Sequence, residues 1–143
     1  MFRDFQQFHM ADSSSYGRAG SAQVDPSGPD SSCPLWLLDS GASLHMTPAA
    51  ASIHHPHPPP QVSRVRIADG TSLPVASIGH LSTRAFSVPA VSHVPGLSMS
   101  LMSVSQLNDF DCQVIFDRTS CRVQDRIGVV LGAGRRHSGV YLL

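Results

Sequence analysis

The most constraining feature of this chain is a series of short apolar segments, each broken after a few residues by proline, glycine or a polar turn. The segments read PLWLL, VSRVRIA, LPVASIG, LSTRAFSV, CQVIF and CRVQD. Runs of this length, rich in β-branched residues and bounded by turn formers, are typical of β-strands. Asp69-Gly70 lies between two of them, and this dipeptide is typical of a tight hairpin. The sequence therefore predicts a mainly β fold.

One short helix is predicted at residues 98–109, SMSLMSVSQLND. Leu101, Val104 and Leu107 recur there at every third position, and Ser98 or Ser100 is a suitable N-cap. The expected architecture is a small closed β-barrel of about six or seven strands, with this helix packed against it.

The length of 143 residues allows at most one ordinary domain. Residues 1–32 mix Ser, Gly, Asp, Gln and Pro without apolar periodicity, so we expect a disordered tail or linker there. A second break, SIHHPHPPPQ at residues 52–61, contains prolines that remove backbone donors and restrict each preceding residue. We expect this segment to be an extended surface loop.

Charge and cysteine content exclude several classes of protein. The formal net charge is zero, so no global field attracts nucleic acid or anionic lipid. The short basic pairs Arg64/Arg66 and Arg135/Arg136 leave nucleic-acid binding as a weak alternative, which we do not expect. Three cysteines without a C-x-x-C pair argue against a secreted disulfide scaffold. No apolar run reaches the ~20 residues of a membrane helix. We expect an intracellular protein without a membrane partner.

The histidines at 54, 55 and 57 resemble a metal cluster by composition. A proline between them holds the backbone extended, and no cysteine or carboxylate lies at a useful spacing. We therefore expect this insert to be exposed and free of metal.

Two other candidate sites have simpler structural interpretations. His45 lies near Ser43, but no G-x-S-x-G turn and no third orienting residue accompanies them, so a serine hydrolase is not expected. Cys112 and Cys121 lie in two strand-like segments that can pair as a hairpin around residues 117–120. Small buried thiols are the expected outcome for this pair.

Asp39 ends the apolar segment in WLLDSGAS. A carboxylate removed from water is costly unless it is paired, hydrogen-bonded or chemically employed. Gly41 allows a sharp turn, and small neighbours leave room beside the carboxylate oxygens. Asp-Ser-Gly is also a common turn, so the tripeptide alone leaves a structural interpretation open.

A longer series of segments resembles a known family. WLLDSGASLHMT closely resembles the start of the protease region in copia-type LTR retrotransposon Gag-Pol polyproteins, a retropepsin-like aspartic protease. The resemblance continues in order through VRIADGTSLPVASIG, HVPGLSMSLMSVSQLND, CQVIF and CRVQD. The terminal SGVYLL resembles the opening of the pre-integrase segment. On the basis of this resemblance we expect residues 33–134 to form the protease domain and residues 135–143 to begin the pre-integrase segment.

The resemblance implies a retropepsin-like closed barrel that acts as a homodimer, with one Asp from each copy sharing a proton around the catalytic water. It implies no cofactor, a peptide substrate from the chain's own polyprotein, and a cytoplasmic setting in a virus-like particle. It assigns two residue sets, the catalytic triplet Asp39, Ser40, Gly41 and the substrate-binding flap turn Asp69, Gly70, Thr71.

The alternative is a catalytically silent retrotransposon-derived fragment. The intact Asp39-Ser40-Gly41 favours the enzyme, because random decay strikes such a motif as readily as any other. The lack of a zinc knuckle before the segment, and of integrase or reverse transcriptase after it, favours the fragment. The HHPHPPP insert at residues 54–60 also departs from the family pattern.

Overall fold

The computed structural model describes residues 35–82 and 87–143, which are mostly strand. The tail expected at residues 1–32 lies outside these ranges. The described residues contain one α-helix, α2 (Val104–Asp109), and a 3-10 turn, η3 (Ala50–Ser52). Their strands are β1 (Trp36–Asp39), β2 (Met46–Thr47), β3 (His54–His57), β4 (Arg64–Arg66), β5 (Ser72–Pro74), β6 (Ser77–Ser82), β7 (Ser87–His93), β8 (Ser100–Ser103), β9 (Cys112–Phe116), β10 (Ser120–Asp125), β11 (Val130–His137) and β12 (Val140–Leu142). The predicted mainly β fold with a short helix is confirmed.

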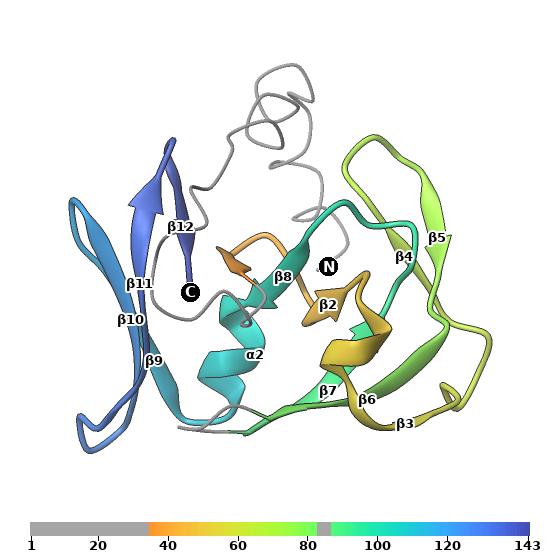
Figure 1. Ribbon diagram of the computed structural model, residues 1–143, viewed down its shortest axis with the longest axis horizontal. Coiled ribbons are helices and arrows are strands. Elements are labelled where there is room, and N and C mark those ends of the chain that lie inside the picture. The colour runs from red at the N-terminus through yellow and green to blue at the C-terminus, as the bar shows by residue number, and fades with distance from the viewer. Residues whose placement is uncertain (1–34, 83–86) are drawn as a thin grey trace.

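Ten strands form one sheet, in the order β3-β6-β7-β2-β8-β1-β12-β11-β10-β9. The other two, β4 and β5, pair with each other as a separate hairpin on one side of the molecule (Figure 1). β3 and β9 each have one neighbour and are not paired with each other in the described sheet. Closure of the barrel is therefore not confirmed, and the strands outnumber the expected six or seven because several are only two to four residues long.

The central pair β1 and β8 separates two apolar clusters. Successive side chains of a strand point to opposite faces, so each of these strands contributes to both clusters. Trp36, Leu38 and Met102 pack in the first cluster, which includes Leu107 of α2. Leu101 packs in the second, with Leu37 against it. This burial on both faces makes the pair the middle layer of the fold.

The helix begins six residues later than predicted. Residues 100–103 form the strand β8, which pairs in parallel with β1 and antiparallel with β2. All four of its residues are buried, so these pairings outweigh the local helical spacing. Ser103 is the actual N-cap, accepting a hydrogen bond from Gln106 N, in place of Ser98 or Ser100.

The His/Pro insert is only partly a loop. His54–His57 form the edge strand β3, which pairs with β6 at His54↔His80 and His57↔Ile78 with a register shift between. All four residues are exposed, as predicted. The prediction of a loop was wrong here because an edge strand needs partners on one side only, so it tolerates the missing donor of Pro56.

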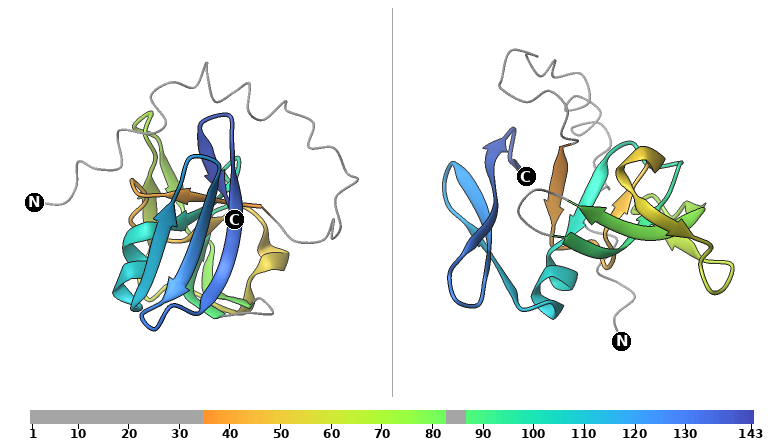
Figure 2. Two further views of the ribbon diagram at one scale, coloured as in Figure 1. Left: turned by 90° about the vertical axis from the view of Figure 1, so that its left-hand side faces the viewer. Right: turned by 60° about the horizontal axis from the view of Figure 1, so that its bottom comes forward.

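The last strands belong to the main sheet. β11 runs across the expected boundary between residues 134 and 135, and β12 pairs antiparallel with β1 through Leu37↔Leu142. Trp36 and Leu143 exchange backbone hydrogen bonds of 3.2 and 2.8 Å. The strands β9 to β12 form one flank of the molecule, drawn in blue in Figure 2. The assignment of residues 135–143 to a pre-integrase segment remains a prediction.

Gly134 of β11 controls how closely β12 approaches β11. A Cβ placed on Gly134 would collide with the backbone carbonyl of Leu142. We expect Gly134→Ala to lower the free energy of unfolding by about 1 to 3 kcal/mol, the usual cost of overpacking. Ala133→Ser, at the exposed neighbouring position, should change it by less than about 0.5 kcal/mol. Urea unfolding measures both, and equal midpoints would contradict the close approach.

Candidate active site

Asp39 is the last residue of β1 and is half-buried. In the parallel register of β1 and β8 it lies opposite Ser103. Gly41 N donates a hydrogen bond of 2.7 Å to Asp39 Oδ1, so the turn anchors its own carboxylate. Ser40 is exposed and Gly41 is half-buried. The structure thus brings the predicted triplet together at the carboxyl end of a buried strand.

Residues 40–45 form an arch over the end of β8. The chain leaves β1 on one side of β8 and returns as β2 on its other side. Ser103 lies under this arch and bonds to it twice. Its Oγ donates to Ala42 O at 2.7 Å, and its backbone N donates to His45 Nδ1 at 3.0 Å. The arch is also tied to α2, because His45 N donates to Gln106 Oε1 at 2.5 Å.

His45 is the buried polar residue of the arch, with 0 % of its surface exposed. Its Nδ1 accepts from Ser103 N, so the proton of the neutral ring lies on Nε2. Within the described part of the chain Nε2 has no hydrogen-bond partner. Burial lowers the pKa of His45 from 6.5 to about 4, so the ring is neutral at physiological pH.

The sequence suggests only Ser43 as a partner for His45 and does not predict its contacts with Ser103 and Gln106. Complete burial prevents the ring from acting as an exposed general base. The available signal was its position between Leu44 and Met46, a polar side chain inside an apolar run.

The predicted hairpin around Asp69-Gly70-Thr71 is confirmed. β4 and β5 pair at Arg64↔Pro74, Val65↔Leu73 and Arg66↔Ser72. Gly70 has a φ of 86°, the left-handed conformation that suits glycine, and its N donates to Ile67 O at 2.9 Å. Thr71 N donates to Asp69 Oδ1 at 2.7 Å. Hydrogen bonds from Thr71 hold the pKa of the Asp69 carboxyl below its usual value.

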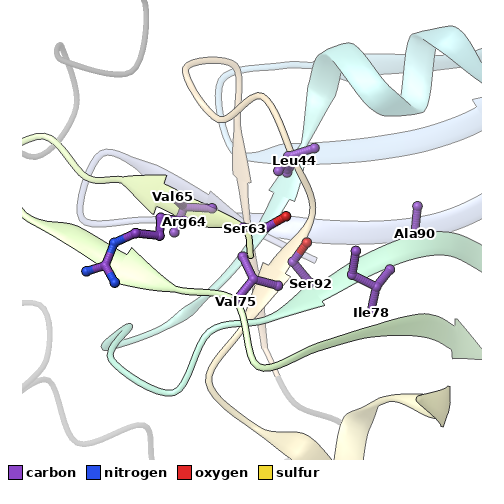
Figure 3. A pocket seen from close by; sticks show the side chains of 8 residues that line it. All are labelled: Leu44, Ser63, Arg64, Val65, Val75, Ile78, Ala90 and Ser92. Atoms are coloured by element: carbon purple, nitrogen blue, oxygen red, sulfur yellow. The ribbon is translucent and has the colours of Figure 1, made fainter. Parts of the chain in front are cut away.

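A pocket of about 260 Å³ lies between this hairpin, β6, β7 and the arch (Figure 3). The residues around it are Leu44, Ser63, Arg64, Val65, Val75, Ile78, Ala90 and Ser92. The Arg64 guanidinium donates to Ser72 Oγ and to the Ser72 carbonyl, so its charge is directed along the hairpin. Leu44 belongs to the arch and follows the predicted triplet by three residues. Because Leu44 lines the pocket together with Arg64 and Val65 of the hairpin, the pocket lies where the arch and the hairpin meet.

The histidine insert lies elsewhere, at the β3 edge. His55 and His80 have ring centroids 5.4 Å apart. In residues 35–82 and 87–143 no group of three or more His, Cys, Asp or Glu side chains is arranged to hold a metal ion. No helix in these ranges is long and apolar enough to span a membrane.

The two cysteines lie in a structural hairpin, and the two arginine pairs lie far from each other. β9 and β10 form the hairpin predicted for the two cysteines. Cys121 is buried and Cys112 half-buried, and burial raises the pKa of both thiols. The two arginine pairs lie on β4 and β11, at opposite sides of the molecule (Figure 1). They therefore do not form a common basic patch.

Comparison with known proteins matches residues 36–112 to the family described as "Pol polyprotein, beta-barrel domain". The chain belongs to this family. It is 33% identical over 112 residues to the "Retrovirus-related Pol polyprotein from transposon RE2" of Arabidopsis thaliana, covering 74% of the chain. It is 31% identical over 112 residues, again 74% of the chain, to the corresponding RE1 polyprotein of the same plant.

The chain spans 8% of the length of either polyprotein. The match confirms the expected relationship to a transposon Pol polyprotein. The family range of residues 36–112 contains the arch, the hairpin, β8 and α2 of this Pol β-barrel domain.

The buried ring of His45 predicts a specific loss of stability in acid. Its pKa is about 4 in the folded protein and 6.5 when unperturbed, so the unfolded chain binds the proton more tightly. The contribution of the neutral His45 ring to the free energy of unfolding is fully present above pH 6.5. It is lost as the pH falls toward 4, by up to about 3 kcal/mol.

His45→Asn removes the titration, while its Oδ1 can still accept from Ser103 N. The free energy of unfolding, measured in urea between pH 7 and 4, should therefore fall less in this variant than in the wild type. All other residues are the same in both proteins, so the difference between the two pH curves reports the ring at position 45. Parallel pH curves would show that the ring is not protected as the structure indicates.

Proposed function

We propose that this domain is the aspartic endopeptidase of a copia-type retrotransposon polyprotein, active as a homodimer. The observation that carries the proposal is the placement of Asp39. It ends a buried strand, its carboxylate is fixed by Gly41 N, and its loop borders the pocket beside the β4–β5 hairpin. Family membership supports the polyprotein origin.

In the proposed reaction each copy supplies one Asp39 carboxylate, and the pair shares a proton. The ionised carboxylate takes a proton from water, which attacks the scissile carbonyl, while the protonated partner gives its proton to the carbonyl oxygen. Two adjacent carboxylates cannot both ionise easily, so they titrate as a pair. Activity is therefore expected at mildly acidic pH.

The hairpin around Asp69, Gly70 and Thr71 is proposed as a flap that closes over the peptide and excludes water. Its separate pairing, outside the ten-stranded sheet, suits movement of this kind. The pocket beneath it is suited to an apolar side chain of the substrate, because Leu44, Val75 and Ile78 supply aliphatic surface. The proposed substrate is a segment of the same polyprotein.

We further propose an intracellular setting in a virus-like particle, a second copy as partner, and no cofactor, nucleic acid or membrane in the reaction. The second candidate is a catalytically silent fragment, which is the expected outcome for a chain that does not dimerise. The sequence contains a single Asp-Ser-Gly, so a chain that stays monomeric holds half a site. Sedimentation equilibrium at high concentration separates the two candidates.

The deciding variant is Asp39→Asn. Asparagine keeps an oxygen that can accept from Gly41 N, so the fold is expected to remain intact, but it removes the ionisable carboxyl from both halves of the dimer. Cleavage of a polyprotein-derived peptide near pH 5 should be abolished. Ser40→Ala should reduce it less, because the exposed hydroxyl carries no proton in the reaction.

The matched control is Asp109→Asn, the same change at an exposed carboxylate at the end of α2. It should cleave like the wild type. Equal activity in wild type and Asp39→Asn would eliminate the protease proposal. Inactivity of a monomeric wild type would support the silent fragment.

A further inference from the structure

The arch that carries the Asp39 turn is held by side chains that the catalytic proposal does not use. One end is fixed by β1, where Asp39 lies opposite Ser103, and the other by β2, where Met46 pairs with Leu101 of the same strand. Between these ends, His45 contacts both Ser103 and Gln106. The backbone oxygen of His45 also accepts from Ser92 N at 2.9 Å, which ties the arch to β7.

We propose that His45 is the positioning residue of this site, holding the Asp39 turn in register over the junction between β8 and α2. This inference rests on the proposed protease function. His45 acts through Ser103, whose backbone pairs with Asp39 and whose hydroxyl bonds to Ala42 within the arch. A change at His45 therefore reaches the carboxylate through two connected contacts, without touching the substrate.

The hydrogen bond between Ser103 N and His45 Nδ1 requires an acceptor at position 45. Ser103 N is a buried donor and needs an acceptor, which the neutral imidazole supplies at 3.0 Å. Protonation would place a second N–H against Ser103 N and break the contact. Leucine fills similar space without an acceptor, whereas asparagine carries an oxygen at the position of Nδ1. These two substitutions therefore separate the hydrogen bond from the packing.

The first measurement is steady-state cleavage by the dimer at a temperature where every variant is folded. In His45→Leu we expect kcat to fall by roughly 10- to 100-fold with KM nearly unchanged, because a small displacement of a catalytic group acts on the chemical step. His45→Asn should restore most of kcat. His80→Leu, at an exposed histidine on β6, is the matched control and should match the wild type.

If His45→Leu fails to fold, two substitutions of Gln106, the acceptor for His45 N, test the same role. Gln106 is half-buried on α2, so its replacement is better tolerated. Gln106→Met removes the acceptor for His45 N and should lower kcat, while Gln106→Glu keeps an acceptor oxygen and should restore it. Either of two results would overturn the positioning role. One is an unchanged kcat in folded His45→Leu or in Gln106→Met. The other is that His45→Asn or Gln106→Glu fails to restore kcat.

The second measurement does not need catalysis. Backbone amide hydrogen exchange in residues 39–47 should accelerate in His45→Leu and stay slow in His45→Asn and His80→Leu. If the wild type cleaves nothing, the protease proposal fails and the exchange pattern alone decides the positioning role. Slow exchange in a folded His45→Leu protein would overturn it.

Discussion

The parallel pairing of β1 with β8 is the constraint on which the rest of the structure depends. It aligns Trp36 with Ser100 and Asp39 with Ser103, and both strands are largely buried. The two apolar clusters form on opposite faces of this pair, and the arch over its end carries the Asp-Ser-Gly turn. The position of Asp39 is therefore a consequence of long-range strand pairing more than of its own turn.

In the proposed protease, the carboxylate pair and the His45 contact favour opposite directions of pH. A pair of carboxylates sharing one proton functions best in mild acid, whereas the neutral form of His45 is favoured by higher pH. Burial lowers the pKa of His45 to about 4, and this depression extends the range over which the contact with Ser103 survives. A solvated histidine at the same position would charge near pH 6.5 and release the arch in the mildly acidic range proposed for the carboxylate pair.

The sequence predicts those elements whose conformation is set by residues close together in the chain. The Asp69-Gly70 hairpin and the hairpin joining Cys112 to Cys121 follow from turn residues and β-branched flanks, and both are confirmed. The spacing of residues 100–103 predicts a helix, but their conformation is set by β1 and β2, which are distant in sequence. The role of His45 was hidden for the same reason, because its partner Ser103 is identified only by the fold.

For the homodimer proposed above, the strand order limits how two copies can bring their Asp39 residues together. β1 is occupied on both sides, by β8 and by β12, so a second copy cannot add a strand to it. The strands with one neighbour in the described sheet are β3 and β9, at its two ends. Two carboxylates that share a proton must lie within hydrogen-bond distance across a two-fold axis. The proposed homodimer therefore requires that axis to pass beside the Asp39 turn itself, with the arch held by His45 and Ser103 in the contact between the copies.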